Sequence, residues 1–166
     1  MSIEAIKTLS MNPHFIAKLI QAFITGYGKP CRIQHVFMAI PILFHEPARK
    51  KLLTANNASR MESLYGKKDN LPNGEQISSQ SQMAGFIRRY ELLQPYVKQA
   101  IIIGCNDQIL EFCNDQKLQC LINLNYSQKG FSKPISKWIR TANYLGKVFR
   151  NATPEQLSYI LEVELP

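Results

Sequence analysis

The chain has 166 residues, of which 45% are hydrophobic, and its 20 Lys and Arg against 12 Asp and Glu give a formal net charge of +8. This hydrophobic content excludes a disordered chain, and the length favours a single domain over residues 1–166 that buries about two-thirds of its unfolded surface. The surplus positive charge favours an anionic partner, such as nucleic acid, an acidic protein surface or a lipid headgroup layer, without selecting among them.

Residues 1–65 are predicted to form a helical N-terminal part. After a short helix over residues 2–9, Asn12 is a good N-cap and Pro13 is favoured at the first helical position, so a second helix should begin there. That helix carries apolar residues at three- and four-residue spacing: Phe15, Ile16, Leu19, Ile20, Phe23, Ile24 and Tyr27. The spacing predicts one apolar face of an amphipathic helix.

The densest apolar stretch runs from Ile33 to Phe44, and we expect the core to pack around it. It is too short to span a bilayer, which needs about 20 residues. Pro41 lies inside it and would kink or break a helix, because proline lacks the N–H and clashes with the preceding turn. Two short buried helices and a single helix that ends near Ile40 are both compatible with the sequence.

Two further short helices are expected before residue 66. His45-Glu46-Pro47 restarts a helix that reaches Thr54, and after a turn at residues 56–59 another helix passes through Tyr65. Together they suggest a helix-turn-helix. Residues 66–82 are polar and contain Pro-Asn-Gly, which predicts an exposed and mobile loop.

Residues 83–166 are predicted to contain a long helix, a hairpin and the C-terminal helices. The long helix should be interrupted by Pro95 and stop at Gly104. Alternating residues at 109–113 and 116–124 flank a polar turn, which is typical of a β-hairpin. A hairpin just after a helix is the layout of a winged-helix wing, and an ordinary hairpin that covers the core is an equal alternative. The expected fold class is mostly α with a small β-hairpin, winged-helix-like.

A helix over residues 136–149 should follow a linker at residues 127–134. At 100° per residue, a basic stripe lies opposite its apolar face: Lys137, Arg140, Lys147 and Arg150. This stripe is the best local candidate for a surface that contacts nucleic acid or an acidic partner, and a solvated helix face is the alternative. The chain should end with a helical turn at Thr153-Pro154 and a strand over residues 159–165.

The sequence gives no support for catalysis or for a cofactor. No phosphate-binding glycine loop, nucleophile elbow or H-E-x-x-H motif occurs, and none of the three His residues has a carboxylate or Cys at catalytic spacing. The cysteines match neither a C-x-x-C pair nor a disulfide framework, so we expect reduced, mostly buried thiols and no metal site. The first ten residues lack a secretory signal pattern, which favours a cytoplasmic protein with no membrane contact. An enzyme with a dispersed active site stays open.

Several motifs, each weak by itself, occur in the order and at the spacing found in a known protein family. They are Asn12-Pro13, Thr25-Gly26-Tyr27, the run Phe37 to Phe44 followed by His45, Arg49, Arg88 to Leu93 with Gln94-Pro95, the hairpin, and Trp138 with Leu145-Gly146-Lys147. Over about residues 12 to 165 this pattern resembles the small middle component of three-component ABC systems (ABC-3C). Within that class it is most similar to the Lamassu type (LmuC-like) of anti-phage and anti-plasmid defence.

The resemblance implies a non-enzymatic adaptor with a winged-helix-like fold. Its partners would be an SMC-like ABC ATPase that senses DNA and an effector subunit, often a nuclease, with double-stranded DNA as a further contact. We expect the apolar helix to bind a partner through Phe15, Leu19, Phe23 and Tyr27. Arg88 and Arg89 join the basic stripe as candidates for contact with nucleic acid or an acidic partner. The alternative is a stand-alone winged-helix DNA-binding regulator.

Overall fold

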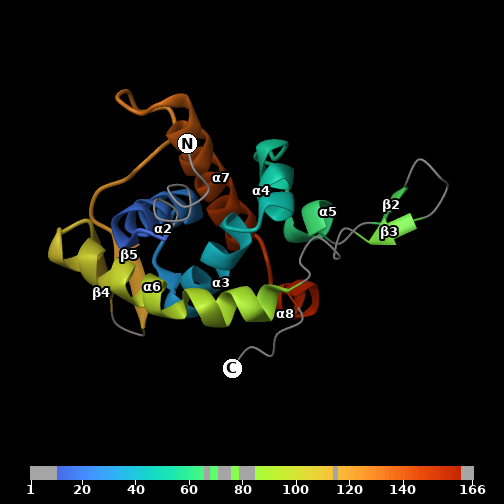
Figure 1. The fold of residues 1–166 in the computed structure, drawn as a ribbon, viewed down its shortest axis with the longest axis horizontal. Coiled ribbons are helices and arrows are strands. Elements are labelled where there is room, and N and C mark those ends of the chain that lie inside the picture. The colour runs from blue at the N-terminus through green and yellow to red at the C-terminus, as the bar shows by residue number, and fades with distance from the viewer. Residues whose placement is uncertain (1–10, 66–67, 71–75, 79–84, 114–115, 162–166) are drawn as a thin grey trace.

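A computed structural model describes residues 11–65, 68–70, 76–78, 85–113 and 116–161. The fold is mostly helical, with a small three-stranded antiparallel sheet at one end of the molecule (Figure 1). Its helices are α2 (Pro13–Tyr27), α3 (Ile33–Leu43), α4 (Glu46–Leu53), α5 (Met61–Tyr65), α6 (Phe86–Asn106), α7 (Lys133–Arg150) and α8 (Pro154–Leu161). Its strands are β1 (Cys31–Arg32), β2 (Lys68–Asn70), β3 (Gln76–Ser78), β4 (Leu110–Cys113) and β5 (Lys117–Cys120).

The centre of the core is the contact between α2 and α7. These helices approach so closely that a Cβ on Gly26 would lie 1.9 Å from the backbone oxygen of Asn143, and one on Gly146 would lie 2.0 Å from that of Phe23. Only glycine fits at either position, because any side chain would push the two backbones apart. The Leu-Gly-Lys and Thr-Gly-Tyr motifs therefore mark a helix crossing.

Helix α2 begins and ends as its sequence predicts. The Asn12 side chain accepts a hydrogen bond from the His14 N–H at 2.9 Å, and Gly28 ends the helix in the left-handed region at φ 78°. An N-cap oxygen satisfies one free N–H of the first turn, and glycine adopts positive φ without a Cβ penalty. The predicted boundaries of this helix are confirmed.

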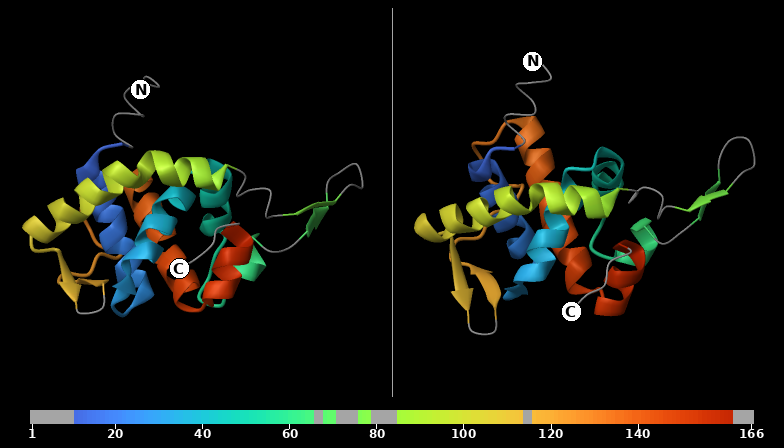
Figure 2. Two further views of the ribbon diagram at one scale, coloured as in Figure 1. Left: turned by 90° about the horizontal axis from the view of Figure 1, so that it is seen from below. Right: turned by 60° about the horizontal axis from the view of Figure 1, so that its bottom comes forward.

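Helix α6 lies across α2 and α3 on the face opposite α7, as the two views of Figure 2 show. Both internal prolines are accommodated: α3 continues through the buried Pro41 to Leu43, and α6 continues through Pro95. The predicted interruption at Pro95 is wrong. Proline removes one hydrogen bond of a helix, and tertiary packing of the flanking turns against neighbouring helices can compensate for that loss.

The predicted hairpin is present. A further strand, β1, which the sequence pattern did not predict, extends it to a three-stranded sheet. Strands β4 and β5 pair antiparallel, and β1 joins the other edge of β5, which gives the order β1-β5-β4. Leu118 and Leu110 of this sheet face the core and are buried. The Leu110 side chain occupies the space where a Cβ on Gly104 would lie, so this glycine allows close packing rather than ending the helix, and α6 continues to Asn106.

Other boundaries differ from the sequence prediction. Helix α7 begins at Lys133 rather than Ser136, because Ser132 is the extended N-cap residue and Pro134 fits the first turn. Tyr159 lies in α8 and not in a strand. Within the predicted loop at 66–82, strands β2 and β3 pair antiparallel. The predicted helix at residues 2–9 lies outside the described residues.

Candidate functional site

The two inner residues of the basic stripe gather around a pair of tyrosines. The Arg140 guanidinium lies 5.1 Å from the ring centre of Tyr144 and 5.9 Å from that of Tyr126. The Lys147 ammonium lies 4.7 Å from the Tyr144 ring centre. These distances are within the range of cation–π attraction. The structure therefore brings Arg140 and Lys147 together on one surface of α7.

The same two cations also connect α7 to the end of α4 and to the segment that follows it. Arg140 donates to the backbone oxygen of Leu53 at 3.0 Å, and Lys147 donates to the side-chain oxygen of Asn57 at 3.0 Å. Part of their hydrogen-bonding capacity thus serves the fold. Lys137 and Arg150, in the first and last turns of α7, are exposed. The stripe consists of two anchored inner cations and two outer ones.

The tyrosine hydroxyls in this cluster influence each other's ionisation. A hydrogen bond between the two hydroxyls lowers the pKa of Tyr144, and the charges of Lys147 and Arg140 act in the same direction. The same hydrogen bond raises the pKa of Tyr126. Such a cluster of cations and hydroxyl donors favours a negatively charged neighbour.

Arg88 and Arg89 lie on another helix, in the first turn of α6. Arg88 is exposed and Arg89 is half-buried. Since α6 packs against α2 and α3, these two arginines belong to a different part of the molecule from the stripe on α7. They form a second, smaller basic position rather than an extension of the stripe.

The predicted partner-binding face of α2 lies mostly inside the chain's own core. Leu19 and Phe23 are 0% exposed and Tyr27 is 8% exposed, with the Phe23 ring 5.3 Å from the ring of Phe149. Phe15 is half-buried against Trp138. The apolar periodicity of α2 is therefore explained by its contact with α7, and Leu19 and Phe23 have no surface with which to contact a partner.

An apolar surface is instead exposed on α6, where the sequence analysis did not place one. Leu92 is 61% exposed and Ile102 is 58% exposed, while Tyr96 and Ile103 are half-buried beside them. At 100° per residue these four fall within one side of the helix. We call them the outer apolar face of α6. Exposed apolar patches of this kind mark interaction sites in soluble proteins.

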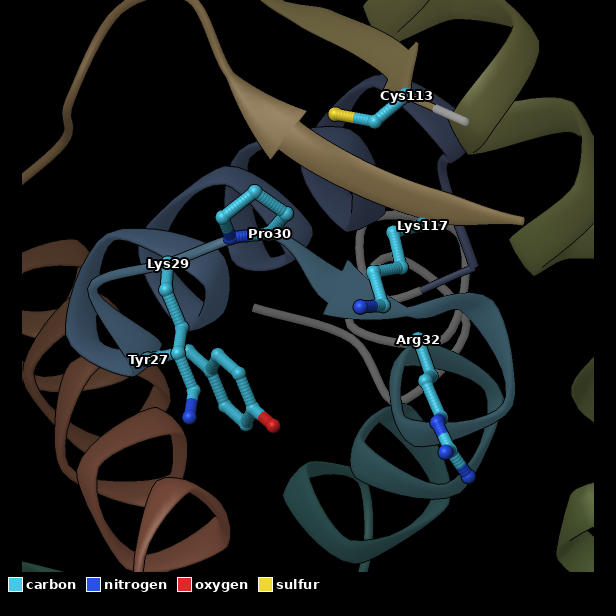
Figure 3. A pocket seen from close by; sticks show the side chains of 6 residues that line it. All are labelled: Tyr27, Lys29, Pro30, Arg32, Cys113 and Lys117. Atoms are coloured by element: carbon cyan, nitrogen blue, oxygen red, sulfur yellow. The ribbon is translucent and has the colours of Figure 1, made fainter. Parts of the chain in front are cut away.

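A cationic cavity of about 470 Å³ opens beside the sheet (Figure 3). Its lining residues come from the end of α2, the loop into β1 and the hairpin: Tyr27, Lys29, Pro30, Arg32, Cys113 and Lys117. The Lys117 ammonium and the Tyr27 hydroxyl point toward its middle, and Arg32 extends along the other side (Figure 3). The sequence alone did not reveal this site. The run Lys29-Pro30-Cys31-Arg32 was its visible signal, but Lys117 is added only by strand pairing.

The ionisable groups near this cavity are poorly suited to nucleophilic or acid–base chemistry. Burial raises the pKa of the Cys31 thiol to about 12 and that of Cys120 to about 11, so both stay protonated. Burial, aided by the charge of Arg32, lowers the pKa of His35 to about 4. Its Nδ1 has no hydrogen-bond partner among the described residues.

Metal binding and membrane insertion find no support in the part of the chain that the structure describes. Within those residues, no group of three or more His, Cys, Asp and Glu could hold a metal ion. None of the helices in the described ranges has the length and apolar character needed to cross a bilayer. All four cysteines are free, with Cys31 buried and the other three half-buried.

Comparison with known proteins matches the chain to a family model described as the ABC-three component (ABC-3C) system Middle Component 3. It covers residues 1–165. No curated protein and no solved structure matches the chain significantly.

Proposed function

The chain belongs to the Middle Component 3 family of ABC-three component systems, and on this premise we propose that it is a non-enzymatic adaptor of a Lamassu-type defence complex. Membership in this family implies partners within a multi-component system. In our proposal the adaptor acts in the cytoplasm, where it bridges an SMC-like ABC ATPase and an effector subunit. The observation that carries the proposal is the family match over residues 1–165.

A bridging subunit needs at least two separate contact surfaces, and this chain offers two of different chemistry. The outer apolar face of α6 suits a stable protein interface, since permanent interfaces are apolar at their centre. We assign this face to the ATPase. The cation and tyrosine cluster of α7, with Arg140 and Lys147, suits an acidic partner or a phosphate backbone. We assign it to an acidic surface of the effector subunit, with duplex DNA as a further contact.

The strand order supports a winged-helix-like arrangement as part of the proposal. In the order β1-β5-β4, the strand before α3 pairs with the second strand of the hairpin, and α6 comes directly before that hairpin. In such an arrangement α6 occupies the place of a recognition helix. A helix that reads bases needs Arg, Asn or Gln directed into the groove. Arg88 and Gln99 are also exposed on α6, but Leu92 and Ile102 occupy the same side of the helix. Apolar residues on that side favour a protein contact over base reading and so favour the adaptor over a stand-alone regulator.

Coexpression of the tagged chain with its native flanking genes tests the adaptor proposal. We expect a large ATPase to copurify through a high-salt wash, because an apolar interface is not weakened by salt screening. The double variant L92S/I102S should reduce the retained ATPase at least about tenfold, since losing about 1.4 kcal/mol of binding free energy lowers affinity by that factor.

The matched control for this experiment is E91S/K98S, which changes two exposed polar residues of the same helix. It also places two serines on α6, so the intrinsic cost to the helix is comparable, but the outer apolar face stays intact. We expect it to retain the ATPase. A lone soluble dimer that protects a palindromic DNA site would contradict the adaptor and favour the regulator.

DNA contact by the α7 cluster has its own test. Affinity of the purified complex for duplex DNA should fall steeply with salt and show little sequence preference, since each neutralised phosphate releases counterions. The variant R140Q/K147Q should lower the slope of log affinity against log salt by about 1 to 2 if both cations meet phosphates. An unchanged slope would contradict contact between the α7 cluster and DNA. The proposed role in complex assembly would not be affected by that result.

A further inference from the structure

The cationic cavity beside the sheet plays no part in the adaptor proposal, and its composition is unusual. Three of its six lining residues are cationic, and none of the six is acidic. Its volume of about 470 Å³ is within the range of about 300–1,000 Å³ that small-molecule sites occupy. Tyr27 and Pro30 add apolar surface to the lining, so the cavity can accept both a charged group and a flatter, less polar one.

Two of the cations are placed directly opposite each other by the sheet. Arg32 of β1 pairs with Lys117 of β5, so their side chains stand on the same face. Like charges opposite each other across a strand pair destabilise it. Among the residues that the structure describes, neither Arg32 nor Lys117 takes part in a salt bridge; the pair that does form is Lys50 with Glu46. Within the described residues, these two like charges therefore share one face of the sheet without an ion-pair partner.

The backbone fixes the positions from which the Arg32 and Lys117 side chains extend. The Ile33 N–H donates to the backbone oxygen of Gln116 at 3.2 Å, which attaches the hairpin to the first residue of α3. Gln116 itself has a φ of 57°, a left-handed conformation that a residue with a side chain adopts at a cost. On the other side of β5, Leu118 is fully buried and fixes the register of the strand. Local strain and charge repulsion therefore coincide at one edge of the cavity.

We propose that this cavity binds a phosphate group, carried by a nucleotide or by a nucleic-acid strand, between Arg32, Lys117 and Lys29. An anion placed there would convert the repulsion between Arg32 and Lys117 into attraction to a common partner. Guanidinium groups bind phosphate oxygens in a two-pronged geometry, and ammonium groups act as mobile point charges beside them. This inference is independent of partner assembly.

Two details match a ligand larger than phosphate alone. The Tyr27 hydroxyl points into the cavity, and burial raises the pKa of Tyr27, so it stays protonated and can donate a hydrogen bond. The Lys29 ammonium lies 5.7 Å from the Tyr27 ring centre, which keeps it beside the cavity mouth. The Tyr27 ring and Pro30 then provide the contact for a sugar or base attached to the phosphate.

Titration calorimetry on the full chain at constant ionic strength tests the proposal. The probes are pyrophosphate, an adenine nucleotide and a 20-base-pair duplex. We expect at least one of them to bind, and the variant R32Q/K117Q should weaken that binding at least about tenfold, since hydrogen bonds from charged donors are about twice as strong as neutral ones. If the nucleotide responds to the variant and the duplex does not, the source of the phosphate is a free nucleotide. Selective weakening of duplex binding identifies a nucleic-acid phosphate.

The matched control is K18Q/K98Q, which removes the same amount of charge from two exposed residues of α2 and α6. We expect less than a twofold loss of binding in this variant. Equal weakening in both double variants would show that only net charge matters, and failure of all three probes to bind the unmodified chain at millimolar concentration would equally overturn the proposal.

A measurement of melting temperature separates loss of binding from loss of folding in the variants. Without ligand and at low salt, replacing Lys117 by Gln should raise the melting temperature by about 1–3 °C, because it removes the cross-strand repulsion. The gain should shrink when pyrophosphate is added to both proteins, since the ligand stabilises only the unmodified site. A fall in melting temperature without ligand would contradict the repulsion on which the proposal depends.

Discussion

Two neighbouring regions of the molecule differ in how their polar and charged groups are satisfied. One is the crossing of α2 with α7, and the other is the edge where β1 pairs with β5. At the crossing, two glycines let backbones touch, and the buried Asn143 donates to the backbone oxygens of Ala22 and Leu124 at 2.6 and 3.0 Å. At the sheet edge, Arg32 and Lys117 face each other beside an open cavity.

The difference separates residues that specify the fold from residues kept for a ligand. A buried polar group that has all its partners stabilises one arrangement of the helices. A pair of like charges with no ion-pair partner among the described residues lowers stability, and our proposal explains that pair by an anion that binds there. His35 lies between the two regions, with its ring 5.8 Å from the ring of Phe149 and its pKa lowered partly by Arg32.

The largest loss of stability should come from adding a side chain where α2 and α7 cross. Replacing Gly146 by Ala places a Cβ 2.0 Å from the Phe23 oxygen, so α2 and α7 must separate along their contact. Overpacking typically costs about 1–3 kcal/mol, and because the clash is with backbone we expect at least about 3 kcal/mol of unfolding free energy to be lost. Urea unfolding followed by circular dichroism measures this.

The control for that substitution is Gly130, where a Cβ would meet nothing within 4 Å although φ is 103°. Alanine there should cost about 1–2 kcal/mol from backbone strain alone. Equal losses at Gly130 and Gly146 would show that the close approach of the helices is not what stabilises the crossing.

A smaller loss should follow from removing the polar link at the same crossing. Replacing Asn143 by Ala leaves the Leu124 oxygen without its donor and the Tyr126 N–H without the acceptor that now lies at 3.1 Å. Unsatisfied buried groups cost about 1–3 kcal/mol each, so we expect about 2–3 kcal/mol in the same urea experiment. Thr141→Val is the comparison, because Thr141 bonds only locally to the Trp138 oxygen, and its loss should be below about 1 kcal/mol.

The smallest effect concerns pH at the boundary between the two regions. The folded state disfavours protonated His35, whose pKa is lowered from 6.5 to about 4, while the unfolded chain takes up that proton below pH 6.5. Stability from this group is therefore complete above pH 6.5 and lost as the pH falls toward 4. After allowing for partial exposure, His35→Gln should remove about 2 kcal/mol of the difference in unfolding free energy between pH 7.5 and pH 4.5. An identical pH dependence in the variant would contradict burial of a neutral imidazole.

Much of the helical architecture could be predicted from the sequence because its signals are local. Asn12 and Gly28 mark the ends of α2, and the alternation around residues 114–115 marks the hairpin. The apolar spacing of α2 also predicts a buried face correctly, but it cannot say whether that face meets another protein or α7. The spacing therefore could not show that Leu19 and Phe23 are buried within the chain's own core, since burial inside a chain and burial at an interface require the same residues.

The sequence by itself determined that this is a mostly helical, basic protein with a hairpin near its C-terminal third, because helix caps, turns and periodicity depend on neighbours in the chain. Tertiary structure decided which side chains are exposed to solvent and which distant residues lie next to each other. Only the packing of α6 on α2 and α3 exposes Leu92 and Ile102, and only the pairing of β1 with β5 places Arg32 against Lys117. These juxtapositions join residues far apart in the chain, and no local pattern encodes a contact whose two halves are about 85 positions apart.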